Sequence, residues 1–120
     1  MSTTQPCVGL LCLAALACGP RVPALAVVGD PAAGARVIAR AECGVCHTIP
    51  GIPGARGIVG PSLAGFAQRP YIAGVLPNEP GRLVPWILDA PALVPDTLMP
   101  PQPLDELEAR DAAAFLYTLS

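Results

Sequence analysis

Residues 50–103 hold most of the chain's 16 prolines, and no other feature of the sequence limits the fold more. Proline lacks a backbone N–H and fixes φ, so long helices and central strands are excluded from this segment. One short helix is expected around Leu83–Asp89, with Pro85 in its first turn or at a kink. So long a stretch with little regular structure is unusual in a compact domain, and it makes sense if its loops wrap around something.

A helix is expected before this segment, over Asp30–Ala41. Asp30 is a good N-cap, and Pro31 suits the first helical position. The apolar face at helical spacing consists of Gly34, Val37, Ile38 and Ala41. A glycine on this face costs helix propensity, but it would let a second helix approach closely.

A second helix is expected after the segment, over Asp105–Leu119. Asp105 as N-cap and Glu108 three residues later form a capping box. The apolar stripe consists of Ala112, Phe115, Leu116 and Leu119. We expect the two helices to pack together, with Gly34 against Phe115 or Leu116.

The sequence Cys43-Gly44-Val45-Cys46-His47 contains the chain's one histidine and matches C-x-x-C-H, the attachment motif of c-type haem. The two thiols would form thioethers with the haem vinyl groups, and the histidine would lie under the iron. A thioredoxin-like pair would need a βαβ context, which the sequence lacks. A structural zinc site needs four protein ligands, whereas this motif supplies three. A disulfide between the cysteines remains open but leaves the histidine without a role.

An uncharged apolar run, Cys7–Gly19, lies near the N-terminus. It is shorter than the roughly 18 residues of a spanning helix and suits a signal peptide. Ala24-Leu25-Ala26 is a small-x-small cleavage site, so residues 1–26 are interpreted as a signal peptide and residues 27–120 as one domain. The alternative is a lipoprotein leader, residues 1–17, with Cys18 lipidated. Either route exports the domain.

The domain from residue 27 onward keeps six Arg against nine Asp plus Glu, a net charge of −3, and contains no Lys. An acidic domain of this size is a poor nucleic-acid binder. Large aromatic rings are few, although they normally supply much of a small core's buried area. Small domains of this kind often depend on a disulfide, a metal or a cofactor, and one bulky cofactor would best fill the deficit.

A haem iron bound by His47 needs a ligand on its other side. The strong axial candidates are His, Met, Cys and Tyr. No second histidine exists, and Met1 would leave with the leader, so Met99 is the candidate. Its alternative role is to fill a gap in the core. With both axial places occupied, the iron cannot bind a substrate, and electron transfer is the remaining activity.

The stretches "GDPAAGARVIARAECGVCHTIPG", "GIVGPSLAGFAQRPY", "LVPWILDAP" and "DTLMPPQ" resemble the class I, monohaem bacterial cytochromes c. The resemblance implies an all-α cytochrome c fold, with crossed N- and C-terminal helices and loops around one covalent haem c. It implies that the Pro61 carbonyl accepts a hydrogen bond from His47 and that Leu63 packs on the haem. Arg69 would pair with a haem propionate, or else be a solvated charge. Trp86 would lie near the methionine side of the haem, or serve the core alone.

These features predict an exported electron carrier, not an enzyme, at the periplasm or the outer face of the cytoplasmic membrane. Its partners would be redox proteins such as a terminal oxidase, a cytochrome complex or a periplasmic dehydrogenase. The alternative is a haem-based sensor of small ligands or a peroxidase-like enzyme with an open sixth position. The family's ring of docking lysines is absent, so the partner is expected to present a basic or apolar patch. The expected contact surface is lined by Ile49, Ile52 and Pro53.

Overall fold

The computed structural model of the protein describes residue 2 and residues 29–120. The proposed signal peptide and the lipidation of Cys18 lie outside the described residues. In chain order the elements are α1 (Pro31–Arg40), the 3₁₀ turns η1 (Cys43–Val45) and η2 (Phe66–Gln68), strands β1 (Tyr71–Ile72) and β2 (Leu76–Pro77), α2 (Pro80–Leu88), α3 (Ala90–Leu93) and α4 (Glu106–Leu116). The described part is therefore helical, with one two-stranded antiparallel ribbon.

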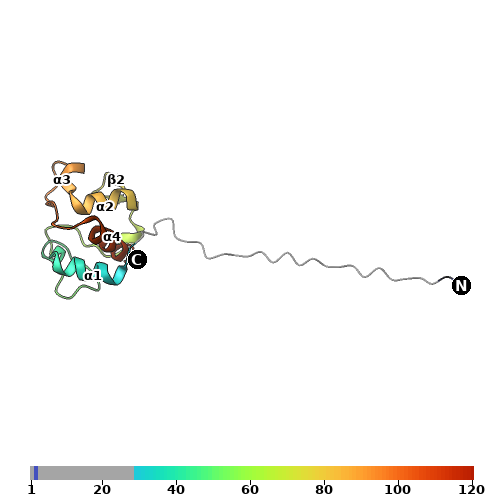
Figure 1. Cartoon of the computed structure of the whole chain (residues 1–120). Helices are drawn as coiled ribbons and strands as arrows, with labels where there is room; N and C mark the ends of the chain where they lie inside the picture. Colours follow the sequence, from blue (N-terminus) through green and yellow to red (C-terminus); the bar gives the residue numbers. More distant parts are fainter. Residues whose placement is uncertain (1, 3–28) are drawn as a thin grey trace.

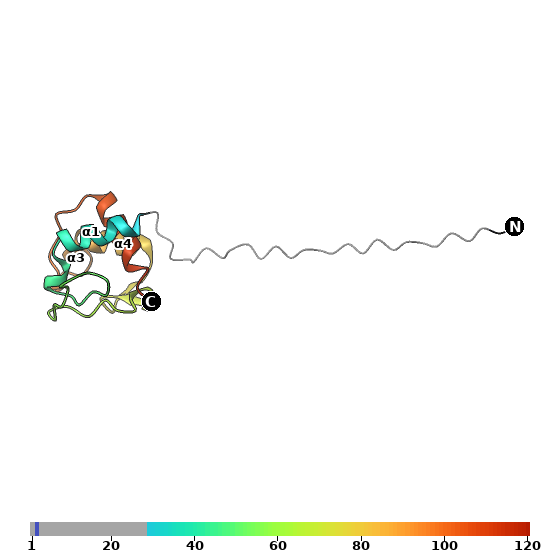
Figure 2. The ribbon, with the colours of Figure 1, turned by 90° about the horizontal axis from the view of Figure 1, so that it is seen from below.

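The first and last helices pack against each other, as the sequence predicted (Figures 1 and 2). Asp30 caps α1, and Asp105 forms the expected capping box with Glu108 at the start of α4. Gly34 is the point of closest approach: a Cβ there would lie 1.9 Å from the Asp111 carbonyl oxygen and 2.9 Å from the Phe115 Cβ. The helix α4 ends at Leu116, three residues before the predicted end.

The ends of α1 are also joined to α4 by polar contacts. The backbone N–H of Asp30 donates to Asp111 Oδ1 at 2.8 Å, and Arg40 forms an ion pair with Glu108 at 2.5 Å. Exposed ion pairs of this kind contribute little free energy. The glycine contact therefore matters more for the α1–α4 crossing than these polar contacts do.

The middle segment forms loops around one regular helix. This helix, α2, starts at Pro80, three residues before the predicted start, and packs against α4. Of the two alternatives predicted for Pro85, a first turn or a kink, the first turn is wrong, because α2 begins at Pro80 and Pro85 lies inside the helix. Asp89 ends α2 and caps α3 by accepting from the backbone N–H of Ala92.

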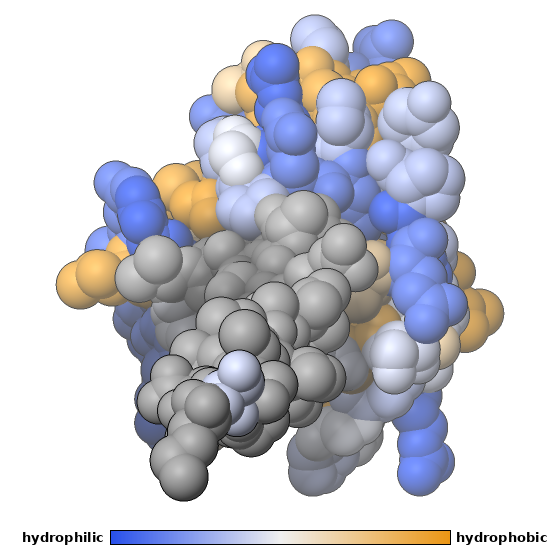
Figure 3. All heavy atoms as spheres, turned by 90° about the vertical axis from the view of Figure 1, so that its right-hand side faces the viewer, coloured by the Kyte–Doolittle hydropathy of each residue, from blue (hydrophilic) through white to orange (hydrophobic). Residues whose placement is uncertain are grey.

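The core lies where α1, α2 and α4 meet the loop segment. Its most buried large side chain is Leu83, and Ile38, Ile49 and Ile72 are almost as inaccessible. On α4 the buried residues are mainly alanines, which lets the neighbouring helices come close. Figure 3 shows one face of the molecule, on which hydrophilic side chains alternate with small, separate apolar groups. None of the helices among the described residues is both long enough and apolar enough to cross a membrane.

Candidate functional site

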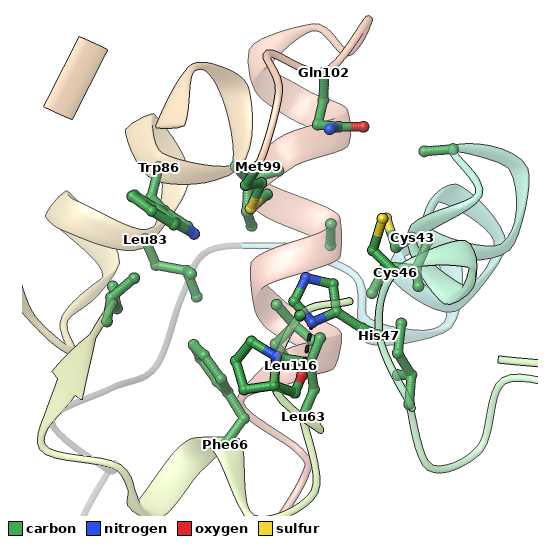
Figure 4. A pocket seen from close by; sticks show the side chains of 18 of the residues that line it. Cys43, Cys46, His47, Leu63, Phe66, Leu83, Trp86, Met99, Gln102 and Leu116 are labelled. Atoms are coloured by element: carbon green, nitrogen blue, oxygen red, sulfur yellow. Dashed lines mark hydrogen bonds between the residues drawn. The ribbon is translucent and has the colours of Figure 1, made fainter. Parts of the chain in front are cut away.

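One cavity of about 540 Å³ gathers all eight residues that the sequence analysis singled out for a cofactor. They are Cys43, Cys46, His47, Pro61, Leu63, Arg69, Trp86 and Met99. Most of the remaining lining is apolar and includes Phe66, Leu83 and Leu116, which the sequence analysis did not connect with a cofactor (Figure 4). The volume falls in the range of small-molecule and cofactor sites. The loops thus surround a space, as the proline-rich segment predicted.

Cys43 is the first residue of the tight turn η1, which begins three residues after the end of α1, and Cys46 is the residue that ends this turn. The His47 N–H donates to the Cys43 carbonyl at 3.0 Å, which closes the turn. A Cβ on Gly44 would stand 2.6 Å from the Ala55 Cβ, so the turn also presses against the following loop. Both cysteines are half-buried free thiols. Burial, and to a lesser extent the neighbouring Cys46, raises the pKa of the Cys43 thiol, opposite to the lowered pKa of a redox-active cysteine.

The His47 ring is fixed by the loop that follows. Its Nδ1 lies 2.7 Å from the Pro61 carbonyl oxygen, so the hydrogen bond expected from the family resemblance is present (Figure 4). A carbonyl oxygen only accepts, so Nδ1 donates the proton in this bond. The lone pair of a neutral imidazole is then on Nε2, which is the arrangement found in histidines that bind metals.

Gly60 lets this loop approach the ring. A Cβ at Gly60 would lie 2.3 Å from His47 Cε1, which no real side chain tolerates. The Gly60 N–H also donates to the Cys46 carbonyl at 2.8 Å, and the Leu63 N–H donates to the Thr48 carbonyl at the same distance. The loop that contains Gly60 and Pro61 therefore runs alongside the Cys-His turn and contacts the His47 ring.

Met99 lies on the opposite wall, close to Trp86 and Leu83, while His47 and the two cysteines project from the other side (Figure 4). The loop carrying Met99 is anchored at both ends. The Met99 N–H donates to Thr97 Oγ1 at 3.2 Å, and the Gln102 N–H donates to the Leu88 carbonyl at the end of α2 at 3.0 Å. The thioether is partly buried and packs against the core.

Arg69 supplies the one guanidinium among the described residues that line the cavity. Its Nη2 donates to the carbonyls of Ser62 and Ala64, and the group lies 6.0 Å from the Phe66 ring centroid. The ion pairs found among the described residues do not include Arg69. A positive group without a carboxylate partner is suited to an anionic part of a cofactor.

This cavity suits a covalently attached haem on its own chemistry. Two thiols follow one helix, an imidazole with a free Nε2 comes next, and a thioether faces them across apolar walls. Among residues 29–120 there is no group of three or more His, Cys, Asp or Glu side chains that could hold a metal ion. The described residues therefore give no support to the alternative in which Cys43, Cys46 and His47 bind zinc.

The family model for cytochrome c matches residues 31–120, and the chain therefore belongs to the cytochrome c family. Members of this family bind a covalently attached haem c, and the placement of Cys43 and Cys46 is consistent with that attachment. The all-α cytochrome c fold predicted from the sequence is confirmed. Membership indicates haem-based electron transfer, the typical role of such a domain. No curated protein matches the chain.

The expected contact surface needs correction. Ile49 and Ile52 are 2 % and 8 % exposed, so they belong to the core, and only Pro53 of that set is on the surface. This loop has no hydrophobic periodicity from which burial could be inferred. The exposed aliphatic side chains beside the Cys-His turn are Val45, Ile58 and Val59, and Leu98 is exposed beside Met99.

Proposed function

We propose that the protein carries single electrons between redox proteins by means of one haem c. The thiols of Cys43 and Cys46 would attach the haem, and His47 and Met99 would bind its iron. The observation that supports this most is the His47–Pro61 hydrogen bond of 2.7 Å, which leaves Nε2 facing a cavity that also contains Met99.

When bound, haem c supplies an iron that alternates between Fe(III) and Fe(II). The chain's residues set the conditions for this change. Pro61 keeps the His47 ring in one orientation, and Met99 provides a neutral thioether, which favours the reduced form relative to a second imidazole. Leu63 and Trp86 exclude water from the cavity walls, and Arg69 brings a positive charge to its edge.

The proposed partners are redox proteins such as a terminal oxidase, a cytochrome complex or a periplasmic dehydrogenase, met outside the cytoplasm. We propose that they dock on the apolar rim formed by Val45, Ile58, Val59 and Leu98. These side chains are 68 %, 90 %, 68 % and 87 % exposed, and all but Ile58 also line the cavity. The rim is apolar, so an apolar patch on the partner would complement it. The chain has no lysine that could form a basic docking ring.

The first experiment is the optical spectrum of the full chain, made in a host that attaches haem c, in both oxidation states. We expect haem that resists acid-acetone extraction, low-spin bands and the weak long-wavelength band of sulfur bound to Fe(III). Met99→Ala should abolish that band and let the reduced protein bind carbon monoxide. Leu107→Ala, at an exposed aliphatic side chain outside the cavity lining, is the control and should change neither property.

Carbon monoxide binding by the unaltered protein would contradict the electron-carrier proposal and support an open sixth position. Extractable haem would contradict the roles given to Cys43 and Cys46. The docking surface has a separate test, the rate of electron exchange with an isolated partner oxidase. We expect Val59→Glu to slow it several-fold and the rate to change little with ionic strength, since the rim is apolar.

A further inference from the structure

Asn78 is the one buried polar side chain among residues 29–120, and it lies outside the set that the sequence analysis connected with the cavity. It is 8 % exposed. A buried amide is costly unless each of its polar atoms has a partner, and here each has one. Both amide hydrogens and the amide oxygen of Asn78 form hydrogen bonds, so the surrounding groups hold this side chain in one position.

The amide of Asn78 holds the turn that carries Arg69. Its Nδ2 donates to the carbonyls of Phe66 and Arg69, each at 3.0 Å. The backbone N–H of Asn78 donates to the Pro70 carbonyl, also at 3.0 Å. One residue thus fixes three carbonyls in five consecutive residues, which leaves the base of the Arg69 side chain little freedom.

The amide is itself oriented from α4. The Tyr117 hydroxyl, at the end of that helix, donates to Asn78 Oδ1 at 3.0 Å. The Phe66 and Arg69 carbonyls can only accept, so Nδ2 is the donor and Oδ1 is left to accept from Tyr117; a flipped amide would lose both bonds to the carbonyls. The Tyr117 ring also packs on Phe66, with ring centroids 5.9 Å apart.

From this base Arg69 reaches the cavity edge. Its guanidinium donates to the carbonyls of Ser62 and Ala64, one and three residues after Pro61. Pro61 is the acceptor of the His47 ring bond. A continuous set of hydrogen bonds therefore leads from α4 through Asn78 and Arg69 to the loop that orients the histidine.

We infer that Asn78, oriented by Tyr117, is a positioning residue that holds the charge of Arg69 at the cavity and thereby raises the reduction potential of the bound centre. This inference rests on the proposed function. A fixed positive charge favours the reduced state, which carries one more electron. Its effect is strong only where the surroundings are poorly solvated. A mobile arginine would spend time in water, where its charge is screened.

The test is a double-mutant cycle measured as reduction potential in the haem-loaded full chain. Arg69→Gln should lower the potential. Asn78→Leu should lower it by at least half as much in the unaltered background and leave it unchanged in the Arg69→Gln background. Gln68→Leu, an exposed amide in the same turn, is the matched control and should have no effect.

Equal shifts from Asn78→Leu in both backgrounds, or no shift in either, would overturn the inference. Should Asn78→Leu fail to acquire haem, Tyr117→Phe serves in its place, because it removes one hydroxyl and keeps the ring. It should lower the potential in the unaltered background alone, and an unchanged potential would overturn the inference equally. If the unaltered protein shows covalent low-spin haem while the cycle fails, the inference falls and the proposed function stands.

Discussion

Adding a single methyl group at Gly34 should loosen the contact between the first and last helices. The new Cβ in Gly34→Ala would stand 1.9 Å from the carbonyl oxygen of Asp111. Ordinary carbon–oxygen contacts are about 3.3 Å, so α1 and α4 must separate there by about 1.4 Å. The carbonyl is part of the α4 backbone and cannot rotate away. Overpacking of this kind costs about 3 kcal/mol, and the better helix propensity of alanine returns about 1 kcal/mol. We expect a net loss of about 2 kcal/mol.

The matched control is Gly81→Ala, the same substitution in another helix. A Cβ at Gly81 in α2 would meet nothing within 4 Å. There the propensity gain acts alone, and we expect an increase of up to about 1 kcal/mol in the free energy of unfolding. The assay is denaturant unfolding of the oxidised, haem-loaded protein, followed by circular dichroism and extrapolated linearly. If the two variants change stability in the same direction, the close-approach argument is wrong.

Three further predictions concern the N-cap of α4, the loop that contacts His47 and the response of stability to pH. Asp105→Ala should cost about 1 kcal/mol in denaturant unfolding, whereas Asp105→Asn, which keeps an acceptor, should cost little. Gly60→Ala should shift the reduction potential and speed exchange of the His47 Nδ1 proton in the reduced protein, because the methyl group would displace the ring; unchanged exchange would contradict this. Burial, and then the charge of Glu79, raises the pKa of Tyr117 to about 12. The stability this contributes is complete below about pH 10, the pKa of an unfolded tyrosine, and is lost as the pH rises towards 12; Tyr117→Phe should unfold with a smaller change between pH 10 and 12.

Local signals in the sequence were sufficient to predict the helices at the two ends of the domain, α1 and α4. Asp30 and Asp105 are caps whose side chains bond to backbone groups a few residues away, and such bonds need no tertiary partner. The predicted helix ends were less accurate: α4 ends at Leu116 and α2 begins at Pro80, each three residues from the predicted position. Helix ends depend on which backbone carbonyls and N–H groups find partners outside the helix, and that is decided by the packing of neighbouring loops.

The loops show where sequence reasoning stopped. Ile49 and Ile52 appear in the sequence as ordinary apolar residues between prolines and a glycine, and nothing local distinguishes them from the exposed Ile58. Their burial depends on the way in which the loop folds back, with the Ile49 N–H donating to the Ala55 carbonyl. The role inferred for Asn78 was equally invisible, because its partners are Phe66, Arg69 and Tyr117, the last 39 residues away.

Several features follow from the sequence alone: two thiols and an imidazole at fixed spacing, one thioether that remains as the proposed second ligand, and capped helices on either side of a segment too rich in proline for regular structure. These follow from covalent spacing and from backbone hydrogen bonding within a few residues. The folded arrangement sets which side chains surround the cavity, which aliphatic groups face solvent, and how Asn78 and Arg69 are connected to the histidine loop. Those properties arise from contacts between segments far apart in the chain, and no local pattern encodes them.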